Sequence, residues 1–234
     1  MNRIIAAALS IAAALAAALP AAAAERRYSV TDYDRVEVEG PYRVTLATGR
    51  PSGVVATGSQ QALERVSIEV QGRTLRIRAN RSAWGGYPGD PVGPVEIAAS
   101  TRDLRAALVV GSGSLAVDKA RGLRLDLSVS GSGQMAVGQV QADNLVVGLL
   151  GSGRIALGGA AKTMRATIQG SGDLDAAALG VEDLTLTADT AGTIAVRAAR
   201  AARVTAIGAG DVRIDGKAAC TLSGPAAATV ACGR

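Results

Sequence analysis

The residues of this sequence best suited to covalent chemistry are Cys220 and Cys232, which lie twelve positions apart near the C-terminal end. Their spacing is not that of a Cys-x-x-Cys redox pair, and a zinc site would need two more ligands of a kind that the chain lacks. In an exported protein, two such cysteines usually pair with each other. We therefore predict a Cys220–Cys232 disulfide, which would contribute about 3 kcal/mol by closing a short loop.

Histidine is absent from the 234 residues. A Ser-His-Asp triad, a Cys-His pair and an imidazole metal site are therefore all excluded. The serines that recur in Gly-Ser-Gly strings are Ser112, Ser132, Ser152 and Ser171. They do not stand in the Gly-x-Ser-x-Gly elbow motif or in a Ser-x-x-Lys motif. We predict no catalytic residue and interpret these serines as structural.

The glycine-rich strings also lack the features of cofactor sites. GSGSLAV has no third glycine and no following helix for a phosphate loop. The place that holds Asp in calcium-binding repeats holds, in successive copies, Ser114, Gln134, Arg154 and Asp173, so no ladder of carboxylates forms. Glycan-cleaving chemistry needs clustered carboxylates or a metal. The densest acidic groups are Asp173 with Asp175, and Glu182 with Asp183. We predict no metal and no cofactor, and a polysaccharide lyase or hydrolase is the alternative to a non-catalytic role.

A loop at residues 82–94 carries the single tryptophan, Trp84, together with Tyr87, four glycines and three prolines. Exposed aromatic side chains on a loop often contact a ligand. One hypothesis is therefore that Trp84 and Tyr87 bind a ligand. The other, which we favour, is that Trp84 folds back and covers an open flank of the protein.

Basic residues suggest a further hypothesis, electrostatic attachment to an anionic polymer. Arg197, Arg200 and Arg203 could form a modest patch, and arginine favours bidentate contacts with phosphate or carboxylate. The charge is small, however: 24 basic and 20 acidic residues remain without Arg3, which leaves +4. Aromatic residues make up only 2% of the chain, so nucleic acid is not an expected partner.

The N-terminal residues 1–24 are typical of a signal peptide. Arg3 precedes an apolar run from Ile4 to Leu19, and small residues lead to Ala24. This run is shorter than the 18 or more residues that a membrane span requires. We predict cleavage between Ala24 and Glu25, export to the periplasm, the cell surface or the medium, and no transmembrane segment in the mature chain.

The elements that must position these residues are set by a repeat. Gly-Ser-Gly begins at 111, 131, 151 and 170, and degenerate copies begin at 190 and 208. Each copy is followed by two apolar residues in alternation. The first of each pair is Leu115, Met135, Ile155, Leu174, Ile194 or Val212, and the second is Val117, Val137, Leu157, Ala176, Val196 or Ile214. One further step leads to Val230 and Cys232.

Alternation within strands and a period near 20 between them predict an all-β fold, a right-handed single-stranded parallel β-helix with turns of about 20 residues. A βαβ unit needs about 30 residues or more. Glycine suits the corners, where φ is positive and successive turns approach closely, and the stacked serine hydroxyls are expected to pair. We expect one domain over residues 25–234, with irregular N-terminal coils over 25–100 and repeat coils over 101–234.

Residues 33–40 (YDRVEVEG), the hairpin RTLRI at 73–77, PVEI at 94–97 and the Leu-x-Leu…Gly-Ser-Gly coils resemble the putative auto-transporter adhesin head GIN domain family. The resemblance runs from about residue 30 to the C-terminal end. It implies a right-handed β-helix that is secreted or resides in the cell envelope, and it supplies no catalytic residues. The expected function is therefore non-catalytic binding or scaffolding, adhesin-like, with an envelope or extracellular polysaccharide or protein as partner.

Overall fold

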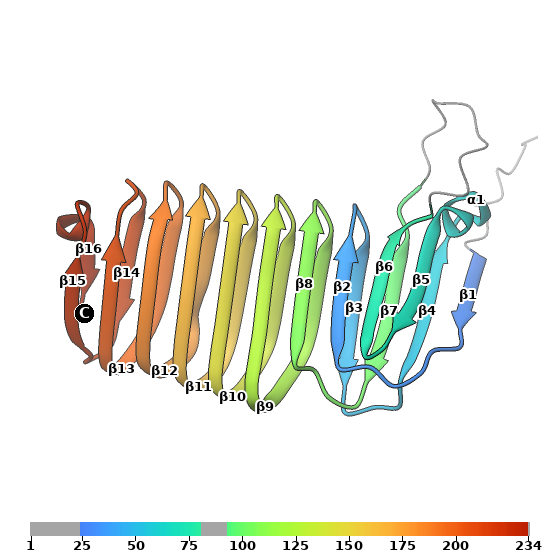
Figure 1. Cartoon of the computed structure of the whole chain (residues 1–234), viewed down its shortest axis with the longest axis horizontal. Helices are drawn as coiled ribbons and strands as arrows, with labels where there is room; N and C mark the ends of the chain where they lie inside the picture. Colours follow the sequence, from blue (N-terminus) through green and yellow to red (C-terminus); the bar gives the residue numbers. More distant parts are fainter. Residues whose placement is uncertain (1–23, 81–92, 234) are drawn as a thin grey trace, which may run out of the picture.

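The computed structural model describes residues 24–80 and 93–233, and these form a β-solenoid of about six turns. Figure 1 shows the turns stacked side by side along the long axis, with the strands in two layers. Five long strands make the repeat coils, and each pairs in parallel with the next. They are β9 (Ser114–Gly131), β10 (Gln134–Gly151), β11 (Arg154–Gly170), β12 (Asp173–Thr190) and β13 (Thr193–Ala206).

Each long strand bends between its two halves, so that the first half lies in one layer and the second half in the other. The first layer continues into β14 (Asp211–Asp215) and β16 (Val230–Cys232), and the second into β15 (Ala219–Ser223). A 3₁₀ turn, η2 (Ala227–Thr229), lies between β15 and β16.

The apolar columns predicted from the sequence are confirmed. Leu115, Met135 and Ile155 are partners in the register of successive strands, and each is at most 1% exposed. In the second layer the same holds for Leu127, Val147, Ala166, Leu186 and Val204. Because side chains alternate between the two faces of a strand, every second residue enters the interior, and the two layers enclose one continuous aliphatic core.

The Gly-Ser-Gly corners depend on the glycines. Gly151 has a φ of +114°, and a Cβ there would lie 2.6 Å from the carbonyl oxygen of Gly131. Successive corners are joined by backbone hydrogen bonds, such as Ser152 N–H to Gly131 O at 3.0 Å. The predicted pairing of serine hydroxyls is wrong: these side chains are exposed, and no hydrogen bond joins them in the part of the chain that the structure describes.

The N-terminal third is less regular than the repeat coils. Its strands are β1 (Ala24–Tyr28), β2 (Arg35–Glu39), β3 (Arg43–Thr48), β4 (Gly53–Gly58), β5 (Val66–Gln71), β6 (Thr74–Ala79), β7 (Glu96–Thr101) and β8 (Ala106–Gly111). The first layer has the order β1-β4-β7-β3-β9, and the second has β5-β6-β2-β8-β9. The pairs β1–β4, β4–β7 and β5–β6 are antiparallel.

The N-terminal third also contains a short helix, α1 (Gln60–Glu64), where the sequence pattern predicted strands alone. The Ser59 side chain accepts a hydrogen bond from the N–H of Ala62 and so caps the helix N-terminus. Ala62 and Leu63 are buried, and α1 packs on β1, β4 and β5. The helix thus packs against the N-terminal end of the core, and Figure 1 shows it at the upper end of β4 and β5.

At the C-terminal end a disulfide links the last strands of the two layers. Cys220 is in register with the buried Ala202 of the second layer, and Cys232 with the buried Ile214 of the first. The structure pairs the two cysteines, with 6.6 Å between their Cα atoms, a separation typical of disulfides. The bond therefore joins the two layers at the turn where the aliphatic columns end.

Candidate binding surfaces

A groove crosses the corner between the two halves of β10, β11, β12 and β13. It has a volume of about 440 Å³. Its walls are formed by Gln141, Ala142, Asp143, Ala160, Ala161, Lys162, Gly180, Val181, Glu182, Arg197 and Ala199. At about 4.8 Å per strand, four strands make this corner groove roughly 14 Å long. It runs along the solenoid axis.

The corner groove results from turns of unequal length. The register shifts between Val137 and Val140 of β10, where β11 has one residue fewer, and shifts again between Ala176 and Gly180 of β12, where β13 has fewer residues. Gly159 allows the tight path of β11, since its φ is +113° and a Cβ would lie 2.2 Å from Val140 O. The small side chains of Ala160, Ala161 and Gly180 along the groove leave its space open.

Charges of both signs surround the apolar floor of the corner groove. Lys162 Nζ lies 2.8 Å from Asp143 Oδ1, and this hydrogen bond raises the pKa of Lys162. Glu182 and Arg197 form no ion pair with another residue in the described ranges 24–80 and 93–233. Among the described residues the walls therefore carry one closed pair and two opposite charges without an ion-pair partner, of which Glu182 also helps to raise the pKa of Lys162 and of Arg200. This balance of charge suits a polar ligand of low net charge.

The predicted arginine patch is only partly available. Arg200 pairs with Asp183, and this contact raises the pKa of Arg200 and lowers that of Asp183. All three arginines belong to β13 and are exposed, but only Arg197 lines the groove. The carboxylate of Asp183 thus offsets part of the positive charge expected from the sequence.

Two of the acidic groups considered for catalysis, Asp173 and Asp183, are held by arginine partners. The Asp173 carboxylate accepts the N–H of Thr193 at 2.9 Å and pairs with Arg154 at 2.8 Å. The backbone hydrogen bond first, and the arginine second, lower the pKa of Asp173. A general acid needs a pKa near the working pH, so a lowered value is unsuited to that role. Within residues 24–80 and 93–233, no group of three or more His, Cys, Asp or Glu side chains could hold a metal ion.

A second depression, of about 560 Å³, lies on the outer surface of β4, β7, β3 and β9. Its floor is made of small outward side chains, including Thr45, Ala98 and Ala116. Asp118 stands at its edge, where its carboxylate accepts the N–H of Thr48 at 3.0 Å. Arg50 also lines this depression, but its floor lacks the charges of both signs that line the corner groove, so the corner groove is the better candidate for a ligand of low net charge.

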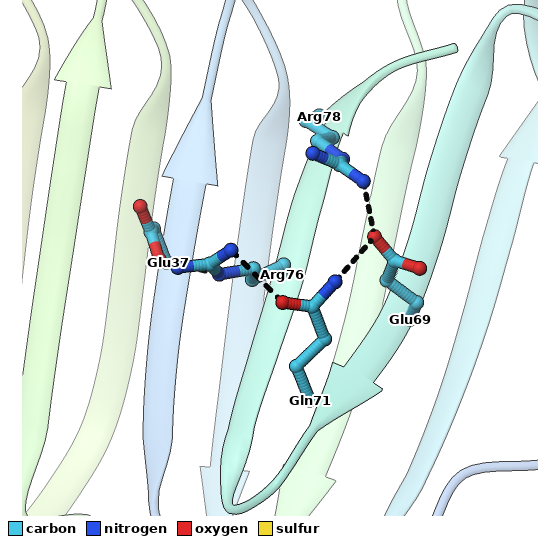
Figure 2. A network of polar contacts seen from close by, with 5 residues as sticks. All are labelled: Glu37, Glu69, Gln71, Arg76 and Arg78. Carbon is cyan, nitrogen blue, oxygen red and sulfur yellow. Dashed lines mark hydrogen bonds and ion pairs between the residues drawn. The ribbon is translucent and has the colours of Figure 1, made fainter.

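A network of charged and polar side chains covers the outer surface of β2, β5 and β6 (Figure 2). Arg76 donates to Glu37 and Gln71, each at 3.0 Å, and Gln71 donates to Glu69 at 3.2 Å. Arg78 lies 2.5 Å from the same Glu69. Each charged side chain of this network pairs with one of opposite charge. The network therefore leaves no unpaired charge of its own for a ligand.

The other sequence-predicted positions lie at the N-terminal end. Trp84 and Tyr87 are outside the described residues, so their proposed ligand contact stays a prediction. Ala24 and Glu25, the predicted cleavage point, begin β1, where they pair with Gly58 and Thr57 of β4. The corner groove was not predicted as a site, although the uneven steps of 20, 20, 19, 20 and 18 residues between repeats were a visible signal of it.

Strand stacking, glycine corners and an axial groove define a β-solenoid with surfaces suited to binding. The sequence profile of the family described as "Putative auto-transporter adhesin, head GIN domain" matches residues 32–218, and the chain belongs to this family. No curated protein matches the sequence. Within the described residues, no helix is long and apolar enough to cross a membrane.

Solved structures share this fold at low sequence identity. A putative adhesin from Bacteroides fragilis is 16% identical, with a TM-score of 0.79 over 91% of this chain and 96% of that one. A putative adhesin from Parabacteroides distasonis is 24% identical, with a TM-score of 0.67 over 92% and 98%. A putative lipid binding protein from the same species is 19% identical, with a TM-score of 0.70 over 90% and 96%. At these identities the likeness establishes the fold alone.

Proposed function

We propose that this protein is an exported, non-catalytic adhesin-like module that binds an extended polysaccharide in the corner groove. Export follows from the predicted signal peptide, residues 1–24, with cleavage between Ala24 and Glu25. The mature chain, residues 25–234, would then act as one domain in the periplasm, at the cell surface or in the medium. Membership of an adhesin-head family supports an external ligand.

The observation that carries this proposal is the composition of the corner groove along the axis. Ala142, Ala161 and Val181 are in register on successive strands and form an apolar strip at the base of the groove, where they are 8%, 6% and 1% exposed. Glu182 and Arg197 beside it offer a hydrogen-bond acceptor and donors. A polysaccharide presents apolar C–H surfaces between hydroxyl groups, so the strip and the charges complement both of its features.

The experiment is binding of the purified protein to an array of bacterial and host glycans, with a variant that fills the corner groove. Gly180 is suited to this change, because it is exposed and a Cβ there would meet only Gly159 O, at 3.8 Å. We expect Gly180→Trp to weaken binding at least about tenfold, equivalent to about 1.4 kcal/mol. Ala136→Trp, on an exposed site of β10 away from the groove, is the matched control and should leave binding unchanged.

The outcomes separate the possible roles. Equal loss with Gly180→Trp and Ala136→Trp, or no glycan binding at all, would refute the groove as a polysaccharide site. Loss with Trp84→Ala and Tyr87→Ala instead would place binding at the aromatic loop. Release of unsaturated or reducing sugar from the bound glycan would show the alternative, a lyase or hydrolase. Capture of a protein from envelope fractions that Gly180→Trp abolishes would identify the ligand as protein.

A further inference from the structure

The two ends of the solenoid differ in how their strand edges are protected. A sheet edge with free N–H and C=O groups tends to pair with another strand, and proteins usually block it with charges or with a covering element. At the N-terminal end α1 packs on β1 and β5, and β1 carries Glu25, Arg26 and Arg27. This end is both covered and charged.

The C-terminal end has the disulfide and the short η2 turn, but no helix and no charged strand. Among the described residues β15 pairs only with β13, and all five residues of β15 are exposed. No residue from 218 to 233 is charged. Leu222, which continues the buried column that ends at Val204, is 37% exposed because no described strand lies beyond it. An unblocked edge and an uncovered apolar side chain are therefore found together.

We propose that two copies of this protein associate through their C-terminal ends, with β15 of each copy pairing antiparallel to β15 of the other. A twofold axis brings the same strand of each copy together in opposite directions. The absence of charge makes this contact self-complementary, since no like charges meet across the axis. Leu222 of each copy would then be covered by the other.

The same reasoning predicts a closed dimer rather than a filament. An open chain of copies needs the C-terminal end of one molecule to fit the N-terminal end of the next. The N-terminal end is covered by α1 and charged along β1, so it does not complement an uncharged edge. Association should therefore stop at two copies, and the dimer would carry two corner grooves for one multivalent ligand.

The test is the molar mass of the purified protein by analytical ultracentrifugation, from about 1 to about 100 µM, the range in which weak complexes become populated. We expect a dimer whose dissociation constant rises at least about tenfold in Leu222→Lys, because two lysines would face each other at the axis. Leu150→Lys is the matched control, since Leu150 is also an exposed leucine (55%) but lies on β10. It should leave the dimer intact.

A second variant guards against loss of folding. Thr221→Lys changes an exposed residue of β15 whose side chain faces away from the core, in register with the exposed Arg203, and it should also yield a monomer with an unchanged circular dichroism spectrum. A monomer at all concentrations would overturn the proposal, as would a dimer that both folded lysine variants retain. Species larger than a dimer would overturn the closed arrangement. Association with a different envelope protein at β15, and not with a second copy, would overturn it too.

Discussion

The N-terminal third and the repeat coils build the same core in different ways. The column of Leu115 continues without interruption into Val44 and Ile97 of the N-terminal strands. In the coils, each strand stacks on the one before it in the sequence. In the N-terminal third, β4, β7 and β3 are neighbours out of chain order, and some pairs are antiparallel. The interior is thus one structure with two types of connection.

The two regions also differ in what holds adjacent turns together outside the core. In the coils, the backbones of the glycine corners are in direct contact, as between Gly151 and Gly131. In the N-terminal third, long side chains such as Arg76 and Glu37 connect the strands (Figure 2). The coils therefore combine a repeated backbone contact with isolated ion pairs between turns, such as that of Arg154 with Asp173, whereas a connected side-chain network joins the N-terminal strands. Substitutions at the corners should act mainly through close packing, and substitutions in the network mainly through charge.

The largest contrast is expected between two glycines of positive φ. Gly151 lies in a corner with Gly131 O 2.6 Å from an added Cβ, whereas Gly72, in the β5–β6 turn, has nothing within 4 Å. Both have a left-handed backbone, which costs an alanine about 1–2 kcal/mol. We expect Gly72→Ala to lower the free energy of unfolding by about that amount, and Gly151→Ala by about 3 kcal/mol or more, since overpacking adds about 1–3 kcal/mol.

Urea unfolding followed by circular dichroism measures both values. The difference between the variants reports the close contact together with the greater backbone strain at Gly151, whose φ is +114° against +62° at Gly72. Equal destabilisation would contradict the role of the corner contact and would leave only the backbone angle as the cause.

A smaller contrast is expected between two arginines. Arg76 contacts Glu37 and Gln71 within the network and is 39% exposed, whereas Arg124 pairs only with Asp126, on its own strand. Exposed pairs contribute little, and networks contribute more. We expect Arg76→Gln to lower the free energy of unfolding by about 1 kcal/mol at low salt, with a smaller loss at high salt. Arg124→Gln should cause no measurable loss.

Thermal unfolding at two salt concentrations tests this difference. If Arg124→Gln destabilised the protein as much as Arg76→Gln, the network would have no special role in the N-terminal third. A loss in Arg76→Gln that did not change with salt would point to packing of the arginine stem instead.

The coils could be predicted from the sequence because one pattern repeats. Leu115, Met135 and Ile155 recur with the same neighbours, so each copy supports the assignment of the next, and their register is as expected. The N-terminal third lacks a repeat, and alternation such as Val36/Val38 indicates a strand but not its partner. The order β4-β7-β3 and the helix at Gln60–Glu64 depend on contacts between residues distant in sequence.

The corner groove was hidden for a related reason. The spacing between repeats showed that some turns are shorter, but not where in the turn the missing residue lies. The register of the folded strands places the shifts next to Gly159 and Gly180. The side-chain contacts show that Lys162 pairs with Asp143, whereas Arg197 forms no ion pair with any other described residue. Likewise, the run from Arg197 to Arg203 suggested a basic patch, and the pairing of Arg200 with Asp183 could not be foreseen.

The smallest expected effect concerns pH and the coils. The pKa of Asp173 lies below its ordinary value of 3.8 chiefly because the carboxylate accepts the backbone N–H of Thr193, and secondly because of Arg154. Its contribution to stability is complete above about pH 4, where the carboxyl is ionised in both states. It is lost as pH falls through the folded pKa, because the unfolded chain binds the proton first.

Asp173→Asn should therefore reduce the acid dependence of unfolding below pH 4. Arg154→Gln should retain most of it, because the Thr193 N–H remains. Urea unfolding from pH 2 to 6 measures how the free energy of unfolding changes with pH. A larger reduction of this pH dependence with Arg154→Gln than with Asp173→Asn would show that the ion pair with Arg154, rather than the hydrogen bond from the Thr193 N–H, lowers the pKa of Asp173.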